Sequence, residues 1–276
     1  MKKMVVTSAV ILLVAVTMAS AQEAQESELH GSIDITYLSK YIWRGFDIYG
    51  DKSAIQPSID LDLFGTGFGV NIMAHRANSS GYEDGERWDY TLYYGNSVFE
   101  DEVYATNYRL AYVYYNYPDV SSHNKTSLDL QEAQALFSWP NILPIKGLVP
   151  SYVLVKLWPS SSGTPVGCRS ASGGTASGFA HIFMLDYGLH VQDLGLESTD
   201  QVLNLHSEMI YNDGVGPNGA NVDHDWSNVV FGISTDFELG NGFVFTPGVY
   251  HQITLDTSVN DDKDETWVSL NFKYKF

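Results

Sequence analysis

The chain ends in Trp267-Val268-Ser269-Leu270-Asn271-Phe272-Lys273-Tyr274-Lys275-Phe276, a stretch in which apolar and polar residues alternate. Successive side chains of a β-strand point to opposite faces. One face of this strand is therefore apolar with an aromatic end, whereas the other carries serine, asparagine and lysine. Such a strand separates an apolar medium from water, as in a transmembrane β-barrel or in the half-buried edge strand of a soluble sandwich.

The N-terminus predicts export from the cytoplasm. Lys2 and Lys3 precede an apolar run over residues 5–16, and Ala19-Ser20-Ala21 forms an A-x-A cleavage site. This order is typical of a secretory signal peptide, and the run is shorter than the roughly 20 apolar residues that a spanning helix needs. We therefore expect a cleaved signal peptide over 1–21, a short periplasmic segment over 22–30 and a β-barrel over 31–276.

The composition agrees with a barrel in a membrane. The 276 residues include 18 Tyr, 13 Phe and 6 Trp, as the aromatic girdles of a membrane barrel require. Only 44% of the residues are hydrophobic. A barrel has this composition because its lipid-facing residues alternate with polar lumenal ones.

Charge and cysteine content exclude other classes of protein. The signal peptide carries two lysines and no acidic residue, so the formal net charge of the mature chain is −20, two units below the −18 of the whole chain. Nucleic-acid binding needs a basic surface, which such a chain lacks. Cys168 is the only cysteine, so a disulfide framework and a cysteine-based zinc site are excluded. We expect no cofactor and no metal centre.

Alternation predicts an all-β, antiparallel, up-and-down barrel of about twelve strands, although ten or fourteen also fit. Ile59 and Leu61, for example, face away from Asp60 and Asp62. No segment of useful length has a helical period, so we expect helices to be absent or short. The predicted strands are 31–43, 53–64, 67–76, 88–97, 102–116, 128–139, 147–157, 179–191, 201–211, 228–238, 243–254 and 266–276.

The links between these strands alternate between short turns and long polar loops. An even number of strands with both termini in the periplasm places the short turns on the periplasmic side and the long loops outside. A soluble sandwich has no reason to alternate in this way, which favours the barrel. The predicted outer loops are Arg44–Lys52, Ala77–Arg87, Tyr117–Ser127, Pro159–Gly178, Asn212–Ser227 and Asp256–Glu265.

Two motifs resemble those of known outer-membrane barrels. Phe272, Tyr274 and Phe276 resemble the aromatic C-terminal signal that the barrel-assembly machinery recognises. The segment Tyr37–Asp47 resembles the S-x-Y-x-x-R-G opening of TorF-type outer-membrane porins, a resemblance that covers the first two strands only. It implies an outer-membrane barrel of a Gram-negative-type bacterium with a transport role and no known substrate. Alternatively, the motif simply ends a strand, with Gly45 turning the chain.

The predicted strand number and facing favour a channel. A twelve-stranded barrel is wider than a packed eight-stranded one and narrower than a general porin, so we expect passive diffusion of small solutes. Carboxylates outnumber basic side chains on the predicted lumenal face, which favours a mild cation preference. The predicted pore-lining residues are Asp34, Arg44, Asp60, Asp62, Arg76, Asp89, Arg109, Glu132, Asp186, His206, Glu208, Asp236, Lys273 and Lys275.

Two alternatives to a channel stay open. One is a structural or surface-interaction barrel with a plugged lumen. The other is an outer-membrane lipid hydrolase, whose histidine and serine must share one strand face so that the imidazole can take the hydroxyl proton. His206 and Ser207 are adjacent and point to opposite faces, which disfavours the enzyme. We therefore expect no catalytic residues.

Some features of the predicted outer loops leave their role open. Asp261–Glu265 and Asp223-His224-Asp225 are acidic, and they form either solvated loops or a weak divalent site shared with lipopolysaccharide phosphates. The Ser/Gly-rich segment Ser160–Ser177 either constricts the pore or lies in solvent. Neither the solute nor the oligomeric state follows from the sequence.

Overall fold

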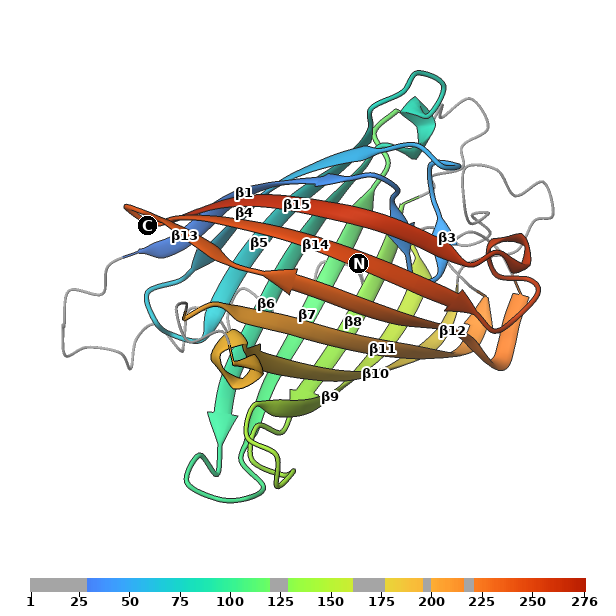
Figure 1. Ribbon diagram of the computed structural model, residues 1–276. Coiled ribbons are helices and arrows are strands. Elements are labelled where there is room, and N and C mark those ends of the chain that lie inside the picture. Colours follow the sequence, from blue (N-terminus) through green and yellow to red (C-terminus); the bar gives the residue numbers. More distant parts are fainter. Residues whose placement is uncertain (1–28, 120–128, 161–176, 196–199, 216–220) are drawn as a thin grey trace, which may run out of the picture.

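The computed structural model describes residues 29–119, 129–160, 177–195, 200–215 and 221–276. These residues form one closed, antiparallel β-barrel of 12 strands (Figure 1). Among them, no helix is long and apolar enough to cross a membrane. The predicted signal peptide, Cys168 and most of the Ser/Gly-rich segment lie outside the described residues.

The barrel wall is built from consecutive strands, each of which pairs with the next in the chain. In the part of the chain that the structure describes, the links contain the short 3-10 turns η1 (Glu83–Gly85), η3 (Val191–Leu194) and η4 (Asn260–Asp262). The wall strands are β1 (His30–Leu38), β4 (Ala54–Asp62), β5 (Phe68–Ala77), β6 (Arg87–Val98), β7 (Thr106–Asn116), β8 (Leu130–Ser138), β9 (Leu148–Pro159), β10 (Ser177–His190), β11 (Val202–Val215), β12 (Asn221–Thr235), β13 (Phe237–Gly240), β14 (Phe243–Thr254) and β15 (Glu265–Lys275).

Closure comes from β1, which pairs with β4 on one side and with β15 on the other. Asp34 faces Ser58 across the first pair and Lys273 across the second. The elements β12 and β13 pair with β14 in a single register, so they are two parts of one strand interrupted at Asp236. Closure leaves the described wall strands without an unpaired edge, as a β-sheet that spans a lipid bilayer requires.

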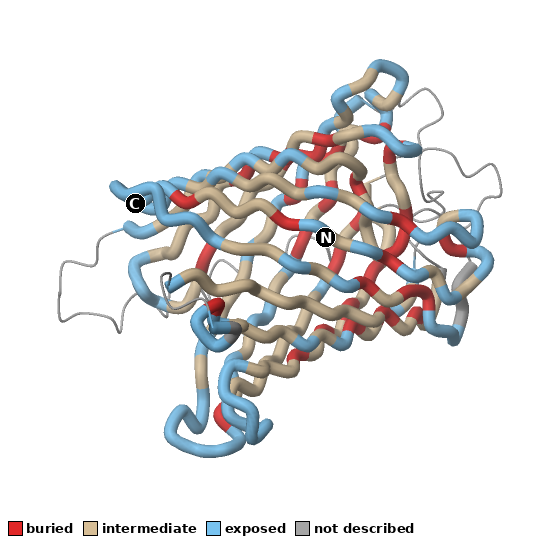
Figure 2. Tube along the Cα trace, in the orientation of Figure 1, coloured by how far each residue is buried: buried red, intermediate tan, exposed pale blue. Residues whose placement is uncertain are grey.

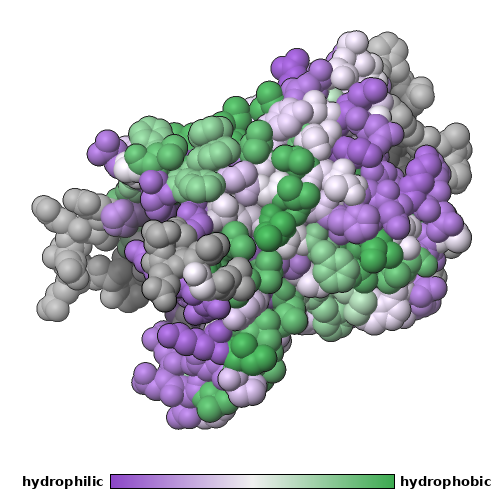
Figure 3. Space-filling model, in the orientation of Figure 1, coloured by the Kyte–Doolittle hydropathy of each residue, from purple (hydrophilic) through white to green (hydrophobic). Residues whose placement is uncertain are grey.

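Register divides the wall into an apolar outer face and a polar inner face. Ile33, Ile35, Phe231, Ile233 and Phe272 are exposed on the outer face. Figure 3 shows hydrophobic residues along the wall and hydrophilic ones gathered toward its ends. Buried residues are most frequent in the half of the barrel near β3 (Figure 2), which is the end that carries the long links. We call this the loop end, and the end with the short links the turn end.

The twelve predicted strands are confirmed. Most of their bounds shift by one or two residues, and three segments differ by more. The first strand ends at Leu38 and not at residue 43, because the chain then turns away from the wall. Residues 102–105 belong to a turn. The predicted outer loop Asn212–Ser227 is largely strand, because β11 and β12 continue past two register shifts before they part.

One close approach of neighbouring strands shapes the lumen. The ring of Tyr250 on β14 lies across Gly232 on β12, where a Cβ atom would lie 2.5 Å from the ring. Only glycine leaves room for an aromatic ring to lie flat against the wall in this way. The interaction orients Tyr250 along the lumenal surface.

We predict that Gly232→Ala lowers the free energy of unfolding by about 1–3 kcal/mol, the usual cost of overpacking, because the Tyr250 ring must move off the wall. Gly95→Ala is the matched control, since its Cβ would lie 3.6 Å from the Tyr108 carbonyl oxygen, an ordinary contact. Urea unfolding of the refolded barrel in vesicles measures both. Equal stabilities for the two variants would contradict the prediction.

Candidate functional site: a hairpin across the lumen

The first long link contains a second, two-stranded sheet. It consists of β2 (Ile42–Trp43) and β3 (Phe46–Asp47), in which Trp43 pairs with Phe46. The turn residues Arg44 and Gly45 have φ angles of 51° and 95°. Two successive positive φ values are typical of the two-residue hairpin turns that follow the strand twist, and glycine tolerates them best.

The hairpin contacts the wall formed by β6, β7 and β8. The guanidinium of Arg44 lies 2.6 Å from the carboxylate of Glu132 on β8, and these side chains are 11% and 0% exposed. Trp43 packs edge-on against Tyr115 on β7, with ring centroids 5.4 Å apart. Arg87 on β6 stacks on the same indole, its guanidinium carbon 3.9 Å from the ring centroid.

The turn of the hairpin also contacts β12 and β14. The side-chain amide of Gln252 on β14 donates a hydrogen bond of 2.8 Å to the Gly45 carbonyl oxygen. A Cβ atom on Gly45 would lie 2.7 Å from Oδ1 of Asn228 on β12. Gly45 therefore meets a steric requirement in addition to its positive φ.

These contacts place the hairpin across the bore. In the closed wall, β6 and β12 are separated by five strands in either direction, so they lie opposite each other. A single turn that contacts both must cross the lumen. The Y-x-x-R-G segment therefore forms a lumenal constriction at the loop end, where the sequence predicted an outer loop.

The base of the hairpin is fixed to the neighbouring loops. Tyr49 is fully buried, and its hydroxyl lies 2.9 Å from the His75 carbonyl oxygen and 3.0 Å from that of Gly85. Phe46 packs with Val259 of the last long link. These contacts attach the hairpin on both sides of its entry into the lumen.

A buried polar network lies beside the hairpin. Both ring nitrogens of His75 form hydrogen bonds. Nδ1 lies 2.7 Å from the side-chain amide of Gln56, and Nε2 lies 2.9 Å from the carboxylate of Asp89. Arg87 donates to both carboxylate oxygens of Asp89, at 2.6 and 2.8 Å, and to the Tyr41 hydroxyl at 2.9 Å. All of these side chains are buried. Buried charges persist only when they are paired and hydrogen-bonded, so the network fixes this wall.

An acidic cluster at the base of the hairpin is occupied by a lysine. Asp47, Asp51 and Glu265 lie close enough together to hold a metal ion. However, the ammonium of Lys40 lies 2.5 Å from Asp51 and 2.5 Å from Glu265. Its hydrogen bond lowers the pKa of Asp51, and the two carboxylates raise the pKa of Lys40. The cluster is an ionic anchor for the hairpin base.

Twelve of the predicted pore-lining residues lie on the lumenal face, and Arg44 reaches the lumen through the hairpin. Asp60, for example, accepts hydrogen bonds from the Tyr93 hydroxyl at 2.6 Å and from the Asn71 side-chain amide at 3.1 Å. The twelve are Asp34, Asp60, Asp62, Asp89, Arg109, Glu132, Asp186, His206, Glu208, Asp236, Lys273 and Lys275.

The prediction for Arg76 is wrong. Arg76 pairs with Ile55 on the outward face, and its side chain is 72% exposed and 3.5 Å from Glu86. Strict alternation along β5 places His75 inside and Arg76 outside. Because Arg76 lies at the loop end of the strand, its charge reaches water beyond the apolar wall.

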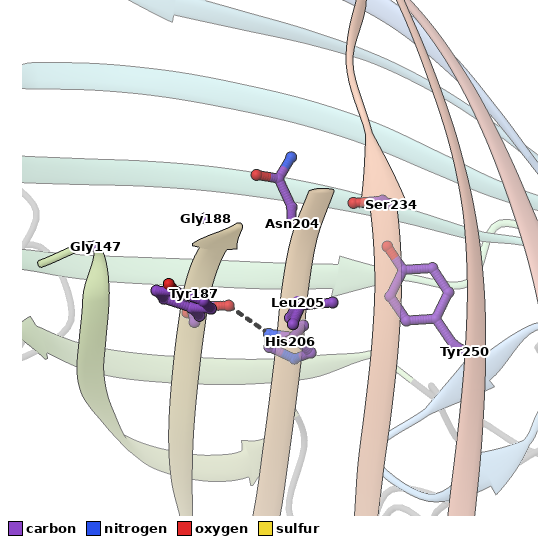
Figure 4. A pocket seen from close by; sticks show the side chains of 9 residues that line it. Gly147, Tyr187, Gly188, Asn204, Leu205, His206, Ser234 and Tyr250 are labelled. Carbon is purple, nitrogen blue, oxygen red and sulfur yellow. Dashed lines mark hydrogen bonds and ion pairs between the residues drawn. The ribbon is translucent and has the colours of Figure 1, made fainter. Parts of the chain in front are cut away.

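Two cavities extend the lumen from the hairpin toward the turn end. One, of about 340 Å³, is lined by Arg44 and Gly45 of the hairpin and by wall residues that include Glu208 and Trp267. The other, of about 420 Å³, is lined by residues that include Asn204, Ser234 and Asp186 (Figure 4). His206 and Tyr250 line both cavities.

The lumen offers no serine partner for His206 among its neighbours in sequence. Nδ1 of His206 lies 2.6 Å from the Asp186 carboxylate, whereas Ser207 faces outward with Leu205 and Met209. The Asp–His pair belongs to the lumenal wall and lies away from the outer surface where lipid chains would approach. Ser207, the serine next to His206 in the sequence, is therefore not its lumenal partner.

Comparison with known proteins identifies the fold. No family model matches the sequence, and no curated protein matches it. Among solved structures, the KdgM porin has a TM-score of 0.52 at 10% identity, over 89% of this chain and 99% of that chain. The NanC porin has a TM-score of 0.53 at 9% identity, over 88% of this chain and 100% of that chain. The chain thus has a porin-type barrel fold.

We predict that Arg44→Ala releases the hairpin from the wall. The substitution leaves the carboxylate of Glu132 buried without its cation, which costs about 3–5 kcal/mol. Hydrogen exchange measures the effect as loss of protection in residues 41–49. Arg76→Ala is the matched control, because an exposed ion pair contributes only about 0–1 kcal/mol. Unchanged protection in Arg44→Ala would show that the ion pair does not hold the hairpin.

Proposed function

We propose that the protein is an outer-membrane channel for passive diffusion of small solutes. The barrel wall is closed and apolar outside, as a lipid-spanning barrel requires, and its fold is similar to that of two porins. The predicted signal peptide and the aromatic C-terminal signal support export and insertion by the barrel-assembly machinery. Lipid and lipopolysaccharide would then surround the wall, with the loop end outside.

The hairpin is the observation that carries this proposal. A barrel with a solely structural role needs a packed interior, whereas here one short hairpin crosses the bore and cavities of about 340 and 420 Å³ lie beyond it. A localised constriction within a wider lumen is the arrangement that selects among diffusing solutes. The constriction carries one arginine paired with one glutamate, so it adds little net charge.

We further propose that the channel prefers cations. At the hairpin and beside it, Arg44 pairs with Glu132 and Arg87 with Asp89, so these charges cancel. Nearer the turn end, the lumenal carboxylates outnumber the lumenal basic side chains, and a surplus of one sign enriches counter-ions. Among the described residues, the lumenal carboxylates that form no ion pair with lysine or arginine are Asp34, Asp60, Asp62, Asp186, Glu208 and Asp236.

A plugged barrel is the second candidate. The buried network of Arg87, Asp89 and His75 favours it, because these groups fill part of the lumen beside the hairpin. A plugged barrel would carry no current. Conductance therefore separates the two candidates directly.

The test is the reversal potential of the refolded protein in a planar bilayer under a potassium chloride gradient. We predict discrete openings and a reversal potential displaced toward the potassium equilibrium potential. The double variant Asp34→Asn/Asp60→Asn should reduce the displacement, because it removes two lumenal charges and retains an amide oxygen at each position. Asp101→Asn, in an exposed turn, should leave it unchanged.

Two results would contradict the proposal. Absence of current from barrels shown to be folded would favour the plugged lumen. A reversal potential toward the chloride equilibrium potential would leave the channel in place and overturn the cation preference.

A further inference from the structure

The cavity beneath the hairpin combines a flat aromatic surface with a carboxylate. Tyr250 on β14 and Trp267 on β15 stack side by side on the lumenal wall, with ring centroids 5.5 Å apart and planes 13° apart. Both rings line the cavity of about 340 Å³. Gly232 lets the Tyr250 ring lie flat, so the aromatic surface is built into the wall.

Glu208 provides the negative charge in this cavity, which Arg44 and His206 also line. Its side chain lies on the lumenal face of β11, opposite Val230 on β12, and lines the cavity. Among the described residues, its carboxylate has no hydrogen-bond or ion-pair partner, whereas Arg44 has Glu132 and His206 has Asp186. Arg44 and His206 line the same cavity but are hydrogen-bonded to other carboxylates, so a further cation in the cavity would satisfy the oxygens of Glu208.

The rest of the lining indicates what kind of cation fits. Leu38, Ile42 and Val230 give the cavity apolar surface for alkyl groups, beside the polar side chains of Thr36, Gln56 and Ser269. Aromatic faces attract ammonium groups through their quadrupole, most strongly when water is excluded. A volume of about 340 Å³ is at the small end of ligand pockets, which span roughly 300–1,000 Å³.

We propose that this cavity is a binding subsite for small organic ammonium ions, which contact Tyr250 and Trp267 with their alkyl or N-methyl groups and Glu208 with their charge. The subsite lies on the lumenal side of the hairpin, so an ion that passes the constriction meets it next. The inference rests on the proposed channel function, since it names a class of solute for that channel.

The experiment uses choline as the probe and the refolded full barrel. In a planar bilayer with potassium chloride, choline should interrupt the potassium current in a saturable manner. 3,3-Dimethyl-1-butanol, a neutral compound of the same shape, should not. Tryptophan fluorescence in detergent measures choline binding independently of conductance. We expect Glu208→Gln and Trp267→Leu each to weaken the apparent affinity at least tenfold in both measurements.

Matched controls separate the subsite from general effects. Glu102→Gln removes a carboxylate from an exposed turn, and Trp158→Leu removes a tryptophan from the outward face of β9. Both should bind choline as the original chain does. Migration in unheated gels shows whether each variant is folded, and Trp267→Phe, which keeps an aromatic face, should restore binding if Trp267→Leu does not fold.

The outcomes for the subsite and for the channel are distinguishable. A conducting barrel that binds no choline, or whose affinity is unchanged in Glu208→Gln, overturns the subsite and leaves the channel in place. A silent barrel that binds choline through Glu208 overturns the channel and supports the subsite. Current interrupted by glucose and not by choline would assign the aromatic surface to saccharides, which also overturns the proposal.

Discussion

The ion pair between Arg44 and Glu132 joins the first long link to the far wall of the barrel, and the arrangement of the lumen depends on it. An ion pair in a poorly hydrated interior is stable only when both partners stay together, so the tip of the hairpin is held at one position. Gln252 and Asn228 fix the same turn from the other side. The hairpin consequently divides the lumen into a narrow part at the loop end and wider cavities beyond it.

The charged side chains on the two sides of the hairpin also differ in how they are paired. Beside the hairpin, arginines and carboxylates cancel in pairs, which stabilises the constriction and leaves it nearly neutral. Beyond it, carboxylates such as Asp60 are bound only by neutral donors. In the channel that we propose, a solute would meet the hairpin first and an acidic, partly aromatic chamber second.

The sequence predicts the wall much better than the contents of the lumen. Side chains of a strand alternate with a period of two, so a clear pattern such as that of residues 267–276 assigns each residue to the inner or the outer face. The turns then mark where the other strands begin and end. That rule correctly placed Glu132 and Glu208 inside. Arg44 is also among the predicted pore-lining residues, but its ion pair with Glu132 does not follow from the sequence, because the contact joins residues 88 positions apart. The predicted lumenal position of Arg76 puts its neighbour His75 outside by alternation, and Arg87 is predicted in an outer loop, so neither is predicted as a lumenal partner of Asp89. The sequence feature that indicates a hairpin here is Arg44-Gly45 between the aromatic residues Trp43 and Phe46, because glycine is favoured in two-residue hairpin turns.

The most direct test of the account is the single-channel conductance of a barrel without the hairpin. Leu38 and Ala54 are paired at the ends of β1 and β4, so a short glycine-asparagine turn can replace residues 39–53 and keep the pairing of these two strands. If the hairpin is the constriction, the shortened barrel conducts several times more current than the complete chain and discriminates less between ions. Equal conductance in the two proteins would contradict the account, because the narrowest part of the path would then lie elsewhere.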